Sequence, residues 1–302
     1  MRWLALSLAA ALLDFLWTLG WIALAHLRFH AFHRRRGLAY PPLGGRGWLR
    51  FYARTLGSIA RLTLWGARAP LAGGLRSPRG GATGPPVLCV HGFHMNGTCM
   101  WGIRRRLERS GRATSAVFLG LPYRPAAAYG PPLARALEAL AARAPEGRID
   151  VVAHSMGGLV LRDVLGRRPD LARAVRRIVT LGTPHHGTAL LAWFRFGPVW
   201  EAMRIGSPYL ARLPDFAASA PGAEVWTLAS QHDLVVYPLE TAFLGGARQV
   251  TFRGIGHLGL LTEPAVLDRV AGALDGVGGG ILSAGGADGD PDRPTGGEAR
   301  EG

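Results

Sequence analysis

Three absences narrow what this sequence encodes. The chain of 302 residues contains no lysine, so its 35 basic residues are all arginine. Only two cysteines occur, Cys89 and Cys99, which excludes a disulfide-rich framework, and Cys89 lies in an apolar run where a free thiol acts as a small hydrophobe. No acidic residue lies between Asp14 and Glu108, although arginine recurs there. This charge asymmetry predicts an anionic partner for the N-terminal part, either nucleic acid or a membrane.

One stretch predicts a nucleophilic serine. Residues 149–153 are mostly apolar and rich in β-branched side chains, Ser155 follows closely, and Gly157 and Gly158 come two and three positions after it. A strand that turns abruptly into a helix exposes one hydroxyl, and small neighbours such as Ala153 leave room for the crowded backbone. Ser155 is therefore the candidate nucleophile. Taken alone, the pattern would also suit a helix that Ser155 caps.

A serine hydroxyl needs a base beside it and a third group to orient that base. His257 follows the strand-like residues 248–252, and Asp233 follows the strand-like residues 224–228. His257 is the last histidine and the only one after Asp233, so we interpret these two residues as base and acid. Two other carboxylates are rivals for the acid role: Glu240 and Asp163.

An upstream turn predicts donors for an oxyanion. Residues 86–90 have the pattern of a buried strand, and a His-Gly-Phe sequence follows at 91–93. A chain that turns out of a strand there aims a backbone N–H at the developing negative charge. The candidate donors are the N–H groups of Phe93 and Met156.

Together these motifs resemble the α/β-hydrolase family, and within it the lipase-like esterases. The motifs that carry the resemblance are residues 91–93, 153–158, 181–188, Asp233 and 256–261. Ala153 stands where the usual G-x-S-x-G elbow has its first glycine. The likeness covers about residues 84–275. It implies an α/β-hydrolase fold, a triad of Ser155, Asp233 and His257, and acyl transfer through an acyl-serine that requires no cofactor.

The remaining histidines do not indicate a metal site. His185 and His186 are adjacent, so their side chains diverge on an extended segment, and no Asp, Glu or Cys cluster joins them. We interpret them as loop residues behind the site, and His91 and His154 as structural neighbours of the site.

From Pro86 on, strand and helix signals alternate, which predicts a mostly parallel sheet with helices on both faces. The predicted strands are 87–91, 114–119, 149–154, 176–181, 224–229 and 248–253. The predicted helices are 98–109, 132–143, 156–167 and 263–274. The connection 185–222 is too long for an ordinary loop and predicts either a lid or a packed helical insertion.

An apolar segment precedes this domain. Residues 3–27 are almost wholly apolar, and 25 helical residues at about 1.5 Å each exceed the roughly 30 Å of bilayer hydrocarbon. A cleaved secretory signal, the alternative, would have a shorter apolar region of about 7–15 residues. We therefore expect a single-pass anchor, a membrane partner and no nucleic acid. Arg28 and Arg34–Arg36 outnumber Arg2, which predicts that the catalytic domain lies on the cytoplasmic side.

Residues 46–68 predict an amphipathic helix. On a helical wheel the arginines form one narrow stripe and the aromatic and aliphatic residues form a separate face. Such a helix suits an anionic lipid interface, and packing on the catalytic domain is the alternative. The arginines are Arg46, Arg50, Arg54, Arg61 and Arg68, and the apolar residues are Trp48, Phe51, Tyr52, Leu56, Ile59 and Leu62.

The sequence thus predicts four parts. They are a transmembrane anchor with its basic flank at 1–36, an amphipathic helix and linker at 37–83, the catalytic domain at 84–275, and a disordered tail at 276–302. The expected activity is hydrolysis of carboxylic esters, lipid or acyl esters in particular, by a membrane-anchored serine hydrolase. Two alternatives are an acyltransferase or thioesterase with the same triad, and a membrane-bound interaction module without catalysis.

Overall fold

The computed structural model describes residues 2–38, 43–66, 76–77, 81–193 and 197–277. Within the first helix, side chains are described at Leu16 and from Leu19 onward. The expected tail beyond residue 277 and most of the expected linker, 67–75 and 78–80, lie outside the described residues.

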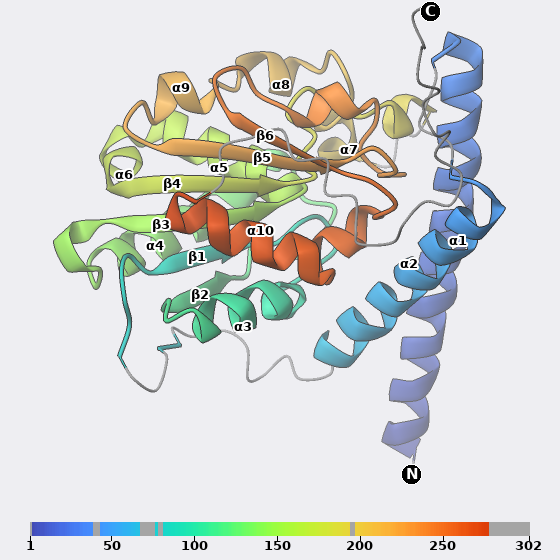
Figure 1. Cartoon of the computed structure of the whole chain (residues 1–302), viewed down its shortest axis with the longest axis horizontal. Helices are drawn as coiled ribbons and strands as arrows, with labels where there is room; N and C mark the ends of the chain where they lie inside the picture. Colours follow the sequence, from blue (N-terminus) through green and yellow to red (C-terminus); the bar gives the residue numbers. More distant parts are fainter. Residues whose placement is uncertain (1, 39–42, 67–75, 78–80, 194–196, 278–302) are drawn as a thin grey trace, which may run out of the picture.

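A six-stranded parallel sheet forms the centre of the catalytic domain (Figure 1). Every neighbouring pair of strands is parallel, in the order β2-β1-β3-β4-β5-β6. This confirms the expected mostly parallel sheet, and each predicted strand is present within a residue or two of its expected bounds. The strands are β1 Val87–Val90, β2 Thr114–Val117, β3 Ile149–His154, β4 Val175–Leu181, β5 Glu224–Ser230 and β6 Arg248–Phe252.

Helices cover both faces of this sheet, as predicted (Figure 1). One face carries α4 Gly130–Ala141, α5 Met156–Arg167 and α6 Pro169–Ala174; the other carries α3 Trp101–Arg109 and α10 Pro264–Asp275. Short 3-10 helices lie in the connections: η2 Gly97–Met100, η3 Ala126–Tyr129, η4 Pro145–Gly147, η6 Leu239–Ala242 and η7 His257–Leu261.

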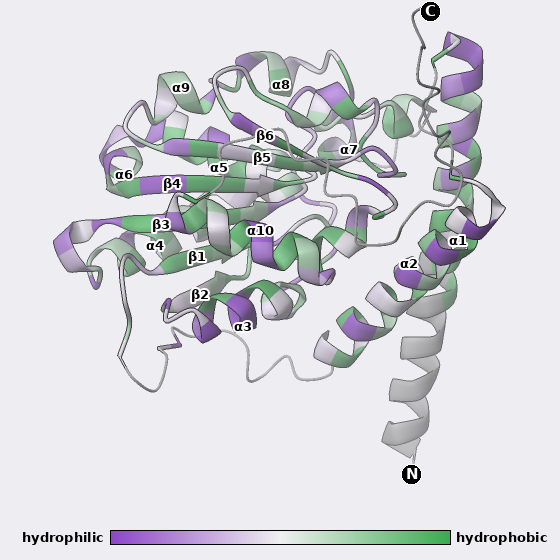
Figure 2. Cartoon of the chain, in the orientation of Figure 1, coloured by the Kyte–Doolittle hydropathy of each residue, from purple (hydrophilic) through white to green (hydrophobic). Residues whose placement is uncertain are grey.

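Two apolar cores flank the sheet because successive strand side chains point to opposite faces. Val151 packs in the core that contains Leu133 and Leu161, whereas Val152 packs in the core that contains Ile103 and Val270. Figure 2 shows how hydrophobic residues concentrate in the strands. Each such fully buried side chain contributes about 1.5–3 kcal/mol relative to its exposed state. The free thiols of Cys89 and Cys99 are buried in the second core, which confirms the prediction made for Cys89.

The long connection between β4 and β5 is a packed helical insertion. It contains η5 Ala189–Trp193, α7 Pro198–Ala202, α8 Pro208–Arg212 and α9 Phe216–Ser219. The buried Arg162 of α5 holds it, since its guanidinium donates to the carbonyls of His185 at 2.8 Å and Leu213 at 2.8 Å and pairs with Asp215 at 2.8 Å. The packed alternative of the sequence analysis therefore describes the observed state.

Two helices precede the catalytic domain: α1 Arg2–Arg36 and α2 Gly45–Gly66. They cross one another near the carboxyl ends of the strands (Figure 1). Among the described residues, no helix is both long enough and apolar enough to cross a membrane.

The helix α2 forms where it was predicted, but its aromatic face does not point to solvent. Phe51 and Ile59 are buried, and Ser58 Oγ lies 2.7 Å from Thr262 Oγ1 of the catalytic domain. Arg61 donates to the carbonyl of Thr262 at 3.1 Å. Packing on the catalytic domain, the alternative of the sequence analysis, therefore describes Phe51 and Ile59. Leu56, which was predicted on the apolar face, is exposed, and so are Leu49 and Leu64.

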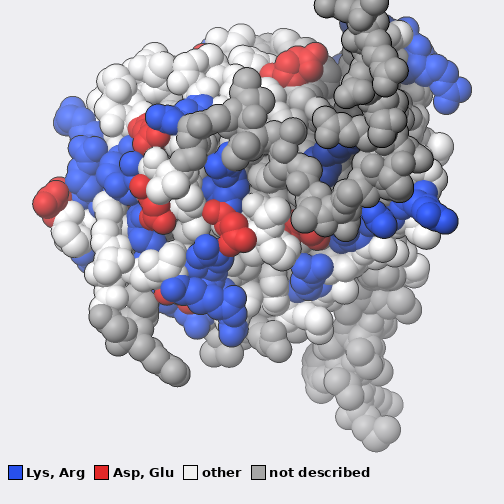
Figure 3. Space-filling model, in the orientation of Figure 1, with Lys and Arg blue, Asp and Glu red and all other residues white. Residues whose placement is uncertain are grey.

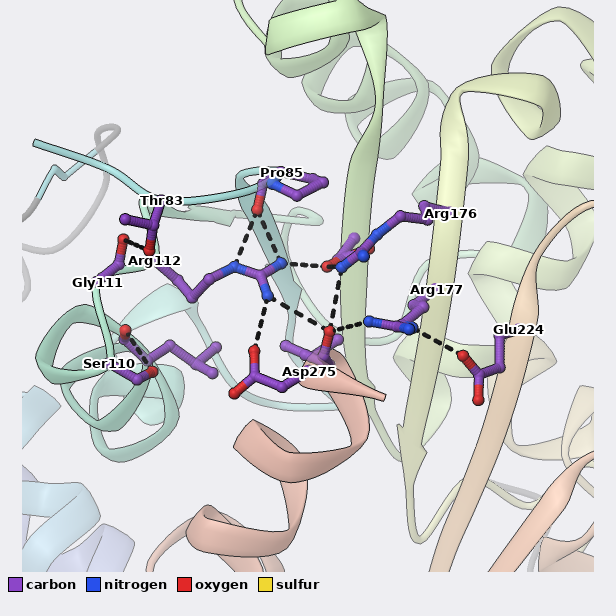
Figure 4. Close-up of polar contacts among 12 residues, drawn as sticks. Thr83, Pro85, Ser110, Gly111, Arg112, Arg176, Arg177, Glu224 and Asp275 are labelled. Carbon is purple, nitrogen blue, oxygen red and sulfur yellow. Dashed lines mark hydrogen bonds and ion pairs between the residues drawn. The ribbon is translucent and has the colours of Figure 1, made fainter. Parts of the chain in front are cut away.

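At the amino ends of the strands, charged side chains form a network (Figure 4). The carboxylate of Asp150 is fully buried and pairs with both Arg112 and Arg176. Arg112 also donates to the carbonyl of Pro85 at 2.8 Å, and Arg177 pairs with Glu224 at 2.8 Å. Figure 3 shows arginines and carboxylates interspersed on this side of the molecule.

Candidate active site

Ser155 lies at a sharp turn between β3 and α5. Its backbone has φ 54° and ψ −128°, a left-handed region that a non-glycine residue rarely adopts. The turn is held because the Ser155 N–H donates to the carbonyl of Leu181 at 2.9 Å. Small residues are required here, since a Cβ on Gly157 would lie 2.6 Å from the His91 carbonyl and one on Gly158 would overlap the Thr183 hydroxyl.

Asp233 and His257 lie on loops that follow adjacent strands, β5 and β6. His257 Nδ1 donates to Asp233 Oδ2 at 2.7 Å, and both residues are buried. The other carboxylate oxygen, Oδ1, accepts the N–H groups of Val235 at 2.8 Å and Val236 at 2.9 Å. Because a carboxylate only accepts, the proton of the imidazole is on Nδ1 and Nε2 is left as the basic nitrogen.

The rival carboxylates lie elsewhere. Asp163 forms an ion pair with Arg167 one turn along α5, at 2.7 Å, and Glu240 is exposed in η6. Of the three candidate acids, the hydrogen bond to His257 belongs to Asp233.

His91 orients the turn that contains Phe93. Its Nε2 accepts the Leu119 N–H at 3.0 Å, so the proton is on Nδ1, which donates to the Gly92 carbonyl at 2.8 Å. Carbonyl and N–H of one trans peptide point in opposite directions, so the Phe93 N–H points away from His91. Burial lowers the pKa of His91 to about 4 and keeps the ring neutral in this role.

The second expected oxyanion donor is the Met156 N–H. Met156 is the first residue of α5, where N–H groups have no carbonyl one turn back to bond and the helix dipole favours negative charge. Phe93 itself lines the cavity beside Ser155, with its ring against Trp200 and Tyr123.

Two further residues support the site: His154, predicted as a structural neighbour, and Gly182. His154 Nε2 donates to the His257 carbonyl at 3.3 Å, and burial lowers the pKa of His154 well below its usual value, so this ring is a neutral support. Gly182 has φ 54°, and a Cβ there would lie 3.1 Å from both Asp233 Oδ2 and His257 Nδ1. The glycine of the Leu-Gly-Thr-Pro motif was the available signal for this close approach.

The adjacent histidines diverge as expected. His185 is buried with Nε2 3.1 Å from the Thr180 hydroxyl, whereas His186 is exposed. Within the part of the chain that the structure describes, no group of three or more His, Cys, Asp or Glu side chains is placed to hold a metal ion.

An apolar cavity of about 240 Å³ opens beside Ser155 and His257. Its lining includes the polar side chains of Ser155 and His257, and most of its other lining residues are aliphatic, aromatic or thioether. Sequence reasoning missed part of this wall, because α1 and α2 also contribute to it. The N-terminal residues that line the cavity are Trp21, Ile22, Ala25, Phe51 and Thr55.

Comparisons with known proteins agree with this architecture. A model of the family described as "Domain of unknown function (DUF7379)" matches residues 76–229, about half of the chain. A search of curated protein sequences finds no match.

Among solved structures, the mature lipase BlEst2 of Bacillus licheniformis is 18% identical, with a TM-score of 0.54 over 63% of this chain and 92% of that one. Its propeptide form is 17% identical, with a TM-score of 0.59 over 70% of this chain. Lipase B of Aspergillus fumigatus is 16% identical, with a TM-score of 0.55 over 67% of this chain. The chain spans about half, 55%, of each of the latter two. At these identities the likeness establishes a lipase-like α/β-hydrolase fold.

Proposed function

The chain belongs to the family described as a domain of unknown function, DUF7379, and we propose that it is a serine hydrolase of carboxylic esters, with lipid or acyl esters as substrates. The observation that carries the proposal is the 2.7 Å hydrogen bond from His257 to Asp233 at the rim of the cavity that also contains the strained Ser155. A buried carboxylate, an oriented imidazole and a hydroxyl on a strained turn that lines a cavity are the parts that acyl transfer requires.

In the proposed mechanism, His257 Nε2 takes the proton of Ser155 as the serine oxygen attacks the acyl carbonyl. Asp233 stabilises the imidazolium that forms. The N–H groups of Phe93 and Met156 donate to the oxyanion, and His257 returns the proton to the leaving alcohol. Water, deprotonated by His257, then attacks the acyl-serine and releases the carboxylic acid.

The substrate class is inferred from the cavity. Its lining includes side chains such as Leu190, Trp200 and Met203, which offer no charge to a ligand. Such a surface favours an apolar acyl group over a charged or sugar-like one.

The proposal is tested with a fluorophosphonate probe and p-nitrophenyl esters. The full chain is expected to hydrolyse the esters and to be labelled at Ser155, whereas Ser155→Ala loses both signals and keeps its thermal stability. The matched control is Ser219→Ala, a half-buried serine in α9 that does not line the cavity, which should retain both. Labelling of a different residue, or full activity of Ser155→Ala, would refute the nucleophile assignment. Added alcohols and thiols test the acyltransferase alternative, since transfer products in excess of the free acid would replace hydrolysis by transfer. Acyl thioesters offered as substrates test the thioesterase alternative, in which they would be hydrolysed faster than the matching oxygen esters.

We also propose that the chain is held at an anionic membrane by its N-terminal helices, with the catalytic domain on the cytoplasmic side. The apolar run before Trp21 supports this, and so do the exposed Leu49, Leu56 and Leu64 of α2, which share that helix with exposed arginines.

Deletion of residues 2–18 tests the anchor. It leaves the contacts from Trp21 onward intact, which deletion of residues 1–70 would destroy. The deleted protein should leave the membrane fraction, and Leu49→Gln/Leu56→Gln/Leu64→Gln in that background should weaken binding to phosphatidylserine vesicles. Val277→Gln, an exposed apolar residue outside these helices, is the control. Retention of the deleted protein at the membrane would contradict the anchor.

A further inference from the structure

The cavity beside Ser155 has walls of two different origins. One wall belongs to the catalytic domain and includes Leu190 and Trp200. The other comes from α1 and α2, which precede the matched family region of 76–229. The catalytic residues alone therefore leave the cavity incomplete, and the N-terminal helices close one side of it.

The helix α1 is seated firmly enough to act as a wall. The ring of Trp21 meets Trp200 edge-on at 5.3 Å between centroids, and Phe29 meets Tyr237 in the same way at 5.3 Å. Phe29 is 1% exposed, and the hydroxyl of Tyr52 in α2 lies 2.5 Å from His26 Nδ1, which ties the two helices together. Contacts at both ends of this segment hold its inward face against the cavity.

Three residues of α1 form the face of the helix that lines the cavity. Trp21, Ile22 and Ala25 line the cavity and lie within one side of the helix, since positions four apart stack one turn above another. Ala25 is the smallest of them and is 1% exposed. A longer side chain at this position projects into the space that a ligand would occupy. Ala23, two positions earlier, is exposed and points away from it.

We propose that α1 forms the wall of the acyl-chain site and that Ala25 determines the length of acyl chain accepted, an inference that rests on the proposed ester hydrolysis. The cavity has a volume of about 240 Å³, which limits the length of the acyl chain that it can enclose. This size matches a medium-chain acyl group, with its carbonyl at Ser155 and its methyl end against α1.

The test compares Ala25→Leu with Ala23→Leu, the same substitution on the exposed side of the same helix. Each is assayed in the full chain with p-nitrophenyl esters from acetyl to palmitoyl. The unaltered protein should prefer esters near octanoyl. Ala25→Leu should lower kcat/KM for octanoyl and decanoyl esters about tenfold relative to the acetyl ester, since single methylene groups in such pockets change discrimination by 10-fold or more. Ala23→Leu should keep the original profile.

A second variant changes the cavity in the opposite direction. Trp21→Ala removes an indole from the same wall, so the preference should shift toward dodecanoyl or longer esters. Circular dichroism and thermal unfolding show whether each variant is folded. An unchanged chain-length profile in both Ala25→Leu and Trp21→Ala would overturn the inference.

A binding measurement separates this inference from the proposed chemistry. In the Ser155→Ala background, decanoate should bind by calorimetry, and Ala25→Leu should weaken that binding about tenfold while Ala23→Leu leaves it unchanged. The acyl-site inference is overturned if decanoate does not bind, or if Ala25→Leu leaves its affinity unchanged. Binding that depends on Ala25, in a chain that hydrolyses no ester, overturns the proposed hydrolysis and supports the site.

Discussion

The two ends of the β-sheet differ in how their buried polar groups are paired. At the amino end, the buried carboxylate of Asp150 pairs with two guanidinium groups, and the surrounding arginines bond carbonyls and carboxylates (Figure 4). At the carboxyl end, His91 and His154 are neutral, Ser155 is strained, and the buried His154 Nδ1 has no partner among the described residues.

This contrast suggests different roles for the two ends of the sheet: paired charges stabilise the amino end, and the groups proposed to react lie at the carboxyl end. The paired charges at the amino end stabilise the folded state only together. Removal of one charged group leaves its partners buried without a counter-charge. Strain and incomplete pairing at the carboxyl end cost stability, but they leave a hydroxyl and an imidazole nitrogen available to react.

The largest expected effect is on catalysis at the carboxyl end. Asp233→Asn should lower kcat about 10⁴-fold, equivalent to about 5.4 kcal/mol, because the imidazole loses its oriented tautomer while the backbone bonds of residue 233 are largely preserved. Ester hydrolysis measures this, with unfolding monitored by circular dichroism. Asp163→Asn is the control, since Asp163 bonds Arg167, and it should keep full activity. Equal losses in the two variants would contradict the assigned acid.

At the amino end the effect should fall on stability alone. Asp150→Asn leaves Arg112 and Arg176 without their buried counter-charge, and it should lower the free energy of unfolding by about 3–5 kcal/mol. Urea denaturation measures the loss. Folded Asp150→Asn protein should react with the fluorophosphonate probe at the original rate, and a slower rate would show that the two ends of the sheet are coupled.

Acid should destabilise the carboxyl end. The pKa of His91 is lowered from 6.5 to about 4 in the folded state, so between these pH values the unfolded chain binds a proton that the folded chain does not. Stability therefore decreases as pH falls from about 6.5 to 4, by up to about 3 kcal/mol at 1.36 kcal/mol per unit. Urea denaturation at several pH values checks this. His91→Asn has no group to titrate and should show a shallower dependence; matching slopes would argue against a neutral, buried His91.

The smallest effect concerns an exposed ion pair. Arg106 and Asp268 lie 2.6 Å apart, but solvent reaches both, with side chains 33% and 63% exposed. Asp268→Asn should change the free energy of unfolding by less than about 1 kcal/mol, because water and salt screen such pairs. Asp150→Asn and Asp268→Asn each remove one carboxylate charge, but only Asp150 is buried. A larger loss in the free energy of unfolding for Asp150→Asn, in the same urea assay, therefore attributes the effect to burial.

Much of the catalytic domain could be predicted from local patterns. The strand Ile149–His154 and the helix Met156–Arg167 have the bounds that β-branched runs and the following glycines predicted. The same reasoning selected Asp233 and His257, because residues directly after parallel strands gather at one edge of a sheet. These predictions rested on patterns of residue type over a few neighbouring positions.

Other features depended on contacts between distant segments. The aromatic face around Phe51 is equally suited to lipid and to protein, and only packing against Gly256 and Thr262 decides between them. Local patterns could not predict that Arg162 holds the insertion between β4 and β5, because its partners lie about 20 to 50 positions away in the sequence.

The sequence by itself determined the order of strands and helices and the types of residue that end each strand, because backbone propensity and side-chain alternation act over a few neighbouring positions. Only the tertiary structure decided that α1 and α2 complete the cavity and that the amino end of the sheet is closed by paired charges. Burial of an apolar face lowers the free energy against any complementary surface, so its partner is selected by the shape of the whole fold.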